Sequence, residues 1–208
     1  MRRQQRKRIP HNETTLGKLN CLYNNQVWVK LLLGKDKKYD EFLEKMCQND
    51  FFKNEERVSI KKISTDSGFN YEHVIKWIAQ IYNDIYELNS EEFHLFKSAG
   101  IKHKCYFRYI DNHAYFTVWL PQSPKEFEEF DFHFVSAKVG THRFWVKNIT
   151  HYMENGEYSV HLELIGDNLN KYREHLVDKA LFENVLNILT MYGQTKREID
   201  EVLKRHYR

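Results

Sequence analysis

The chain has 208 residues, of which 41% are hydrophobic and 29% are charged, so it is long enough and apolar enough to bury a core. No apolar run reaches the length of a membrane-spanning helix, since Lys30 interrupts the most apolar window, Val27 to Leu33. The N-terminus lacks the apolar core of a secretory signal. Cys21, Cys47 and Cys105 are odd in number and widely spaced, which argues against a disulfide framework or a zinc knuckle. We therefore expect a reduced, cytoplasmic protein without a membrane partner.

The formal net charge of +3 originates at the N-terminus. Residues 1–8 contain no acidic residue and five basic ones: Arg2, Arg3, Arg6, Lys7 and Arg8. The rest of the chain holds 27 basic and 29 acidic residues, a net charge of −2. We predict that residues 1–14 form a disordered basic tail, which can bind nucleic-acid phosphates through counterion release without reading a sequence. The alternative is a solvated leader that aids solubility.

Helical periodicity dominates residues 15–99. Apolar positions predict one helix from Thr15 to Leu33 and another from about Lys37 to Gln48. Gly34, between them, is a natural C-terminal stop because glycine readily adopts a left-handed backbone conformation. We expect residues 15–99 to form a helical domain.

Two further helices are predicted to meet at Gly68. Ser59 has the side chain of an N-cap for the shorter helix. Asn70 can cap the longer one, which keeps apolar residues at helical spacing as far as about Leu88. Gly68 supplies the left-handed turn between them.

The residues around Gly68 resemble the helix–turn–helix of DNA-binding proteins over about twenty positions. That family has a small residue in the first helix, a glycine four positions later, and buried apolar residues six and nine positions after the glycine. The residues at these positions are Ser64, Gly68, Val74 and Trp77. The small residue lets the second helix cross closely, the glycine makes the turn, and the apolar side chains hold the second helix in place.

The resemblance implies that the second helix lies in the major groove of DNA. The expected contact residues, besides the basic tail, are Lys61, Lys62, Thr65, Asn70, Tyr71, Glu72, His73 and Lys76. Asn70 would pair with adenine edges and Lys76 with guanine or phosphate, whereas the residues of the first helix would hold the DNA backbone. Four basic and four acidic residues balance between Arg57 and Glu87. A corner that is buried on several sides, or one that binds another protein, therefore remains an alternative.

Residues 100–166 change to strand periodicity. Five strands are predicted, at residues 103–110, 113–120, 130–134, 143–153 and 158–164. Asp111-Asn112 and Glu154-Asn155-Gly156 supply the turns of two hairpins. Phe130, Phe132 and Phe134 alternate with polar residues, so one face of the third strand is expected to be buried. With no room for crossover helices, we predict an antiparallel meander or a small open barrel.

The last segment returns to helical periodicity. An apolar period begins at Asn168 or Asn170 and is broken by Gly193. Thr195 and Glu198 have the spacing of a capping box, which starts a final helix. The sequence therefore predicts an α+β fold: a helical helix–turn–helix-like domain at residues 15–99, then a five-stranded antiparallel meander or open barrel with a C-terminal helical hairpin at residues 100–208.

Eleven histidines raise the question of a metal ion. His133 and His161 are expected on polar strand faces, where Asp131 and Glu163 lie two residues away, and imidazole with carboxylate can hold Zn²⁺ or Mn²⁺. No HExxH or other compact ligand spacing occurs, and solvent-facing histidines explain the pattern without an ion. We expect neither a metal nor another cofactor.

The sequence motifs favour a noncatalytic protein. No G-x-S-x-G and no glycine-rich phosphate loop occurs, so an enzyme would need dispersed catalytic residues.

The β region is rich in aromatic and basic residues. The aromatic set is Tyr106, Phe107, Tyr109, Tyr115, Phe116, Trp119, Phe144 and Trp145, and the basic set is Lys102, Lys104, Arg108, Lys138, Arg143 and Lys147. Small barrels stack single-stranded bases on exposed rings beside basic residues. Alternation assigns most of these rings to the core, but one ring of each adjacent pair, such as Tyr106 and Phe107, must face away from it.

The function expected from the sequence is noncatalytic DNA binding, in the regulation or maintenance of DNA. One alternative is a component of a protein assembly, through a protein partner or self-association. The other is binding of RNA or a single strand on the aromatic sheet.

Overall fold

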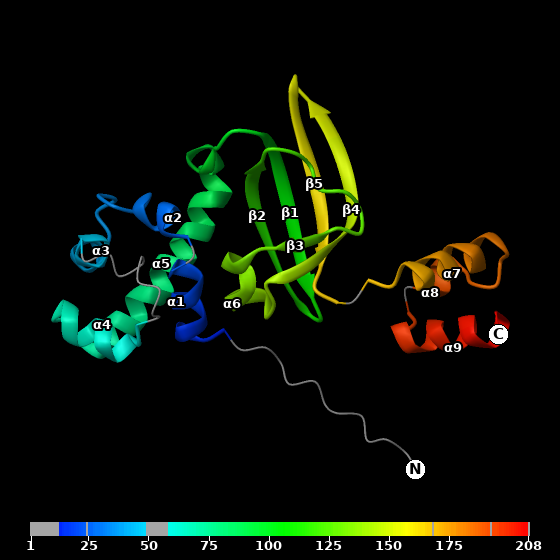
Figure 1. Ribbon diagram of the computed structural model, residues 1–208, viewed down its shortest axis with the longest axis horizontal. Helices are drawn as coiled ribbons and strands as arrows, with labels where there is room; N and C mark the ends of the chain where they lie inside the picture. The colour runs from blue at the N-terminus through cyan, green and yellow to red at the C-terminus, as the bar shows by residue number, and fades with distance from the viewer. Residues whose placement is uncertain (1–12, 24, 49–57, 168, 192, 208) are drawn as a thin grey trace, which may run out of the picture. The chain divides into compact units, whose positions relative to one another are not determined.

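The computed structural model describes residues 13–23, 25–48, 58–167, 169–191 and 193–207 (Figure 1). Residues 1–12 of the predicted basic tail, with all five of its basic residues, lie outside these ranges. The chain divides into two compact units, Met1–Asp167 and Asn168–Arg208. A division at residues 99 and 100 was expected instead, but the helices before that point and the strands after it share one core cluster. None of the helices in the described ranges is long and apolar enough to cross a membrane.

Helices make up the first part of the first unit. They are α1 (Thr15–Tyr23), α2 (Gln26–Lys30), α3 (Asp40–Gln48), α4 (Ile60–Ser67), α5 (Tyr71–Glu91) and the 3-10 helix η1 (Phe93–Phe96). The single helix expected up to Leu33 is divided into α1 and α2. At the break the Asn25 side-chain amide donates to the carbonyl oxygen of Cys21, at 2.8 Å. Apolar residues keep their helical spacing through this break, so the sequence pattern gives no sign that the helix is interrupted.

Helix α5 is the central helix of this unit. It contacts α1, α2, α4 and the sheet, and Figure 1 shows it running from α4 to the edge of the sheet. Its inward face buries apolar residues along nearly its whole length: Val74, Ile78, Ile81, Tyr82, Ile85 and Leu88. The hydroxyl of Tyr82 donates to the carbonyl oxygen of Phe134 at 3.0 Å, which ties the helix to the β region. Burial raises the pKa of Tyr82, so the phenol stays protonated and able to donate.

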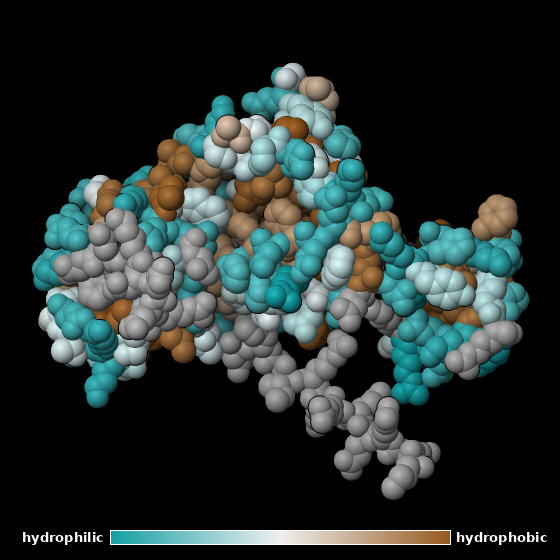
Figure 2. Space-filling model, viewed as in Figure 1, coloured by the Kyte–Doolittle hydropathy of each residue, from teal (hydrophilic) through white to brown (hydrophobic). Residues whose placement is uncertain are grey.

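Five strands form one mixed, curled sheet in the order β2-β1-β5-β4-β3. They are β1 (Ile101–Tyr109), β2 (Asn112–Leu120), β3 (Glu129–Asp131), β4 (Arg143–Glu154) and β5 (Glu157–Ile165). The prediction of a purely antiparallel sheet was wrong, because β1 runs parallel to β5, with Cys105 opposite Leu162. Alternation of apolar residues shows that a strand has a buried face, but it does not show which strand lies beside it. In Figure 2, apolar residues are visible at the centre of this unit, with hydrophilic residues around them.

The third strand is shorter than expected. Pairing with β4 ends at Asp131, and the chain then forms a 3-10 helix, η2 (His133–Val135), and a short helix, α6 (Ser136–Val139). Phe134 and Val135 are both fully buried, which consecutive positions of a half-buried strand do not allow. The strand predicted at residues 130–134 is therefore wrong in its second half, which is helical.

The second unit contains α7 (Lys171–Phe182), α8 (Ile188–Met191) and α9 (Lys196–His206). The helix expected to continue to Gly193 is interrupted after Phe182, where Asn184 adopts a left-handed φ of 57°. The predicted capping box is confirmed, since Thr195 and Glu198 bond reciprocally at the start of α9. This unit has an apolar cluster of its own, formed by Val177, Ala180, Leu186, Ile199 and Leu203.

Asn89 closes part of the free edge of β2. Its side chain belongs to α5 and is only 3% exposed. Its Nδ2 donates to the carbonyl oxygen of Thr117 at 2.9 Å, and its Oδ1 accepts from the Thr117 backbone amide at 2.7 Å. The side-chain amide thus takes the place of a neighbouring strand at one point, which protects the edge against pairing with another chain.

We expect Asn89→Ala to lower the free energy of unfolding by about 2 kcal/mol, because the two backbone groups of Thr117 lose their partner. Urea denaturation of the full chain measures this change. Asn83→Ala, at an exposed position of the same helix, is the matched control and should stay within about 0.5 kcal/mol of the parent. Equal losses in the two variants would contradict the role given to Asn89.

Candidate nucleic-acid interface

The two helices predicted around Gly68 form with their predicted caps. The hydroxyl of Ser59 accepts from the Lys62 amide at 3.2 Å and starts α4. Gly68 ends α4 with a left-handed φ of 75°. The Oδ1 of Asn70 then accepts from the Glu72 amide at 2.8 Å and starts α5. We refer to residues 60–76, from the start of α4 to Lys76, as the α4–α5 corner.

One side of the corner is held by apolar packing. Ile63 and Val74 are fully buried, and the half-buried Trp77 ring packs against Phe42 of α3 and Phe69 of the turn, at 5.4 Å and 5.1 Å between ring centroids. Ser64 does more than leave space, because its hydroxyl donates to the carbonyl oxygen of Phe69 at 2.7 Å, across the turn. The angle between the two helices is therefore fixed by packing and by this hydrogen bond.

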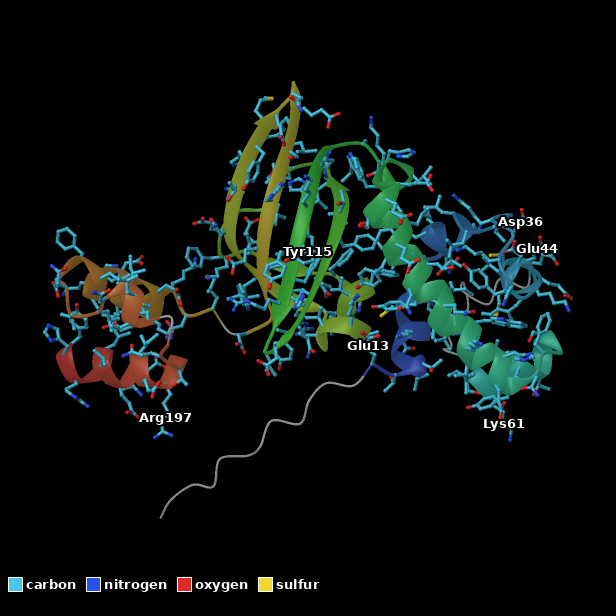
Figure 3. The ribbon with its side chains drawn as sticks, turned by 180° about the vertical axis from the view of Figure 1, so that it is seen from behind. Glu13, Asp36, Glu44, Lys61, Tyr115 and Arg197 are labelled. Atoms are coloured by element: carbon cyan, nitrogen blue, oxygen red, sulfur yellow. The ribbon has the colours of Figure 1, made fainter. Side chains whose placement is uncertain are left out.

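The other side of the corner is open to solvent. All eight contact residues expected there are exposed: Lys61, Lys62, Thr65, Asn70, Tyr71, Glu72, His73 and Lys76. Figure 1 places the corner at the end of α5 that points away from the sheet, and Lys61 is labelled there in Figure 3. Two of these side chains have structural contacts as well. Asn70 uses its carbonyl oxygen as a cap, which leaves its NH₂ group to face a ligand, and the His73 ring lies 5.4 Å from Trp77.

The corner carries a small excess of positive charge. Three lysines and two carboxylates lie between Ile60 and Lys76. Lys45 of α3 also lies beside the corner, with its Nζ 3.5 Å from the carbonyl oxygen of Ser67 and 4.5 Å from the centroid of the Phe69 ring, but Glu41, at 3.2 Å, offsets its charge. Lys45 was not predicted as part of this surface because it precedes Ile60 by 15 positions and only the fold brings them together.

A second surface lies on the open face of the sheet. Strand register places two rows of side chains across four strands: Thr117, Lys104, His161 and Thr150 in one row, and Tyr115, Tyr106, Glu163 and Asn148 in the next. These residues line a hollow of about 320 Å³. We call these two rows the open face. In Figure 3, Tyr115 is labelled on the sheet, well separated from Lys61 at the corner.

Aromatic rings at the open face are arranged for stacking. Tyr106 and Tyr115 stack on each other at 4.8 Å between centroids, and Tyr115 is 68% exposed. The neighbours Phe107 and Phe116 are buried on the opposite side, so the prediction that one ring of each adjacent pair faces away from the core is confirmed. A planar ligand such as a nucleobase could add to the exposed side of Tyr115.

Basic side chains surround these rings. Arg108 and Lys147 both approach Oε1 of Glu163, at 3.4 Å and 3.3 Å, so this single carboxylate offsets part of their charge. Partial burial, together with the positive charges of Lys104 and Lys102, lowers the pKa of His161. The imidazole is therefore neutral at neutral pH, and its ring lies 4.0 Å from that of Tyr152.

Two of the expected basic residues lie elsewhere. The Nζ of Lys138 lies over the Tyr86 ring of α5, at 4.7 Å, and Arg143 lies opposite Asp131 in the backbone register of β4 and β3. Within the described ranges, Asp131 and His133 come together with His142, and not with His161 or Glu163 as the metal hypothesis supposed.

Gly68→Ala should destabilise the chain by about 1 kcal/mol, because an L-residue is strained in the left-handed region. An added Cβ would meet nothing within 4 Å, so the backbone conformation alone causes the loss. Chemical denaturation gives the value. Gly68→Asn is the matched variant and should lose less, since asparagine tolerates this conformation better. If Gly68→Ala leaves the free energy of unfolding unchanged, the turn is not constrained as described.

Comparison of the chain with protein-family models, with curated proteins and with solved structures finds no match. Its function is therefore inferred from its own residues and geometry.

Proposed function

We propose that this chain is a noncatalytic DNA-binding protein that holds duplex DNA against the α4–α5 corner, in the regulation or maintenance of DNA. The observation that carries the proposal is the two-sided character of the start of α5. Its inner side is anchored through Val74 and Trp77, and its outer side presents polar and basic residues to solvent. The major groove of B-DNA admits an α-helix, and a helix end that is held rigidly can present side chains to base edges.

The residues of the corner have distinct roles in this proposal. The amide group of Asn70 and the hydroxyl of Tyr71, at the first turn of α5, face the base edges. Lys76, one turn further along, contacts guanine or a phosphate. Lys61 and Lys62 of α4 hold the backbone of the DNA, which sets the register without reading a sequence. The positive end of the α5 dipole adds to the attraction of phosphate.

The basic tail supplies affinity in this proposal, and the corner supplies register. The body of the chain is slightly acidic, so the long-range attraction toward DNA comes mainly from the five basic residues at its N-terminus. Salt should therefore weaken the complex strongly.

A triple variant with Lys61, Lys62 and Lys76 changed to Glu should bind duplex DNA at least about tenfold more weakly. The slope of log affinity against log salt concentration should be shallower by up to about 2.7, which is roughly 0.9 for each lost phosphate contact. Fluorescence anisotropy with a labelled duplex, at several salt concentrations, measures both quantities. Thermal unfolding checks that the exposed substitutions leave the fold intact.

The control carries the same change of charge on the sheet, with Lys104, Arg108 and Lys147 changed to Glu. It should retain most of its affinity for duplex DNA. Equal loss in both triple variants would indicate general attraction by charge, and no binding by the parent chain would end the proposal. A variant with serine at five positions should bind all sequences more weakly to the same extent: Arg2, Arg3, Arg6, Lys7 and Arg8.

A second candidate function is binding of single-stranded DNA or RNA on the open face. The stacked pair of Tyr106 and the exposed Tyr115, with Lys104 in the adjoining row, favours it. Bases add to exposed rings whatever their sequence, and nearby cations bind the backbone.

Tyr115→Ala should weaken binding of a single-stranded oligonucleotide by roughly 5- to 160-fold, the range that corresponds to about 1–3 kcal/mol for one stacked base. Tyr172→Ala is the matched control, because Tyr172 is 67% exposed and belongs to the second unit. Anisotropy with labelled DNA and RNA oligonucleotides provides the measurement. If Tyr115→Ala binds as tightly as the parent, the open face is not the binding surface.

A further inference from the structure

We infer that Asp131, His133 and His142 form a binding site for one divalent transition-metal ion, with Zn²⁺ as the principal occupant. One carboxylate oxygen and one ring nitrogen from each histidine lie within 4.8 Å of one another. The inference does not depend on the proposed DNA binding.

The backbone holds the three residues in place. Asp131 is the last residue of β3, and His133 begins η2 immediately after it. Opposite them, the backbone amide of Phe132 donates to the carbonyl oxygen of His142 at 2.7 Å. The thiol of Cys21 donates to the carbonyl oxygen of His133 at 3.3 Å, which joins this segment to α1. These hydrogen bonds therefore fix the backbone positions from which the three side chains extend.

The three side chains lie close together. The His133 and His142 rings lie nearly parallel, at 12°, with 4.3 Å between their centroids. Nε2 of His133 is 3.5 Å from Oδ1 of Asp131. In a tetrahedral zinc site with bonds of about 2.0–2.1 Å, neighbouring donor atoms lie roughly 3.3–3.5 Å apart. A ring nitrogen binds a metal ion in the plane of its ring, so the two stacked rings must rotate to direct one nitrogen each at the same ion. Such rotations need not displace core residues, because Asp131 and His133 are exposed and His142 is half-buried.

The donor set selects the class of metal. Two imidazoles and one carboxylate suit Zn²⁺, Co²⁺ or Ni²⁺, whereas Mg²⁺ and Ca²⁺ prefer sites built from oxygen alone. Three protein ligands leave one position of a tetrahedral ion for water or an outside ligand. A bound ion would also join the end of β3 to the start of β4 and so stabilise the short edge strand.

The sequence hypothesis of a metal placed His161 and Glu163 beside Asp131 and His133. The site found instead uses His142, nine residues after His133. A sequence scan misses this spacing because it spans η2, α6 and a turn that return the chain to β3. The fold is therefore needed to find the third ligand.

The test is isothermal titration of the full chain with ZnCl₂, supported by the visible absorption spectrum of the Co²⁺ complex. We expect one ion per chain. His133→Ala and His142→Ala should each weaken binding by at least about tenfold, and Asp131→Asn should weaken it while keeping the shape of the side chain. His113→Ala, at an exposed strand histidine of β2, is the matched control and should bind as the parent does.

A second measurement keeps the inference falsifiable if a variant is destabilised. Zn²⁺ should raise the melting temperature of the parent and of Cys47→Ser, but not that of His142→Ala, because only a site in the folded state shifts the unfolding equilibrium. The inference is overturned if binding is absent, if it survives in both histidine variants, or if it is lost in Cys47→Ser or His113→Ala.

Discussion

Burial of one face of α5 is the constraint on which the first unit depends. Apolar side chains from Val74 to Leu88 hold the helix against its neighbours over most of its 21 residues. Because the helix is held along this length, its two ends become fixed points. The first turn presents the exposed residues of the α4–α5 corner, and Asn89 near the last turn clamps the edge of β2. A change in the packing of α5 would therefore affect both the corner and the sheet.

The two proposals assign different forms of nucleic acid to the corner and to the open face. The corner is a rigid helix start whose apolar residues are turned inward, so its contacts are polar and its shape suits a groove. The open face offers an exposed ring and a hollow, which suit unstacked bases. Both surfaces carry a small excess of positive charge. Lys104, Arg108 and Lys147 lie near the single carboxylate of Glu163 on the sheet, and three lysines accompany two carboxylates at the corner. Shape, and not charge, is therefore the reason that the primary proposal places duplex DNA at the corner.

The features predicted well from the sequence are those that neighbouring residues determine. The caps at Ser59 and Asn70, the turn at Gly68 and the capping box at Thr195 all depend on contacts over a few residues, and all are present. Strand positions were also close, because alternation reports the local environment of each strand. The exposure of the corner could be expected from the placement of its polar residues around the helix.

The features that were missed depend on contacts between distant segments. Hydrophobic alternation does not distinguish a parallel neighbour from an antiparallel one, so the pairing of β1 with β5 was not predicted. Phe134 and Val135 form a 3-10 turn because both find partners in the core, which overrides the strand pattern. Lys45 lies beside the α4–α5 corner, and His142 lies beside Asp131 and His133, only because the fold brings these segments together. Sequence spacing around either residue gives no signal for these contacts.

The parallel pairing of β1 with β5 has a consequence for the order in which the sheet assembles. The β1–β2 and β4–β5 hairpins each need only a short turn, whereas Cys105 and Leu162, which face each other across the parallel pair, are 57 positions apart in the chain. Closing so long a loop loses more chain entropy than forming either hairpin. Topologies rich in such distant contacts fold more slowly than those built from local ones. We therefore expect the joining of the two hairpins to be the late and slow event in the folding of this unit.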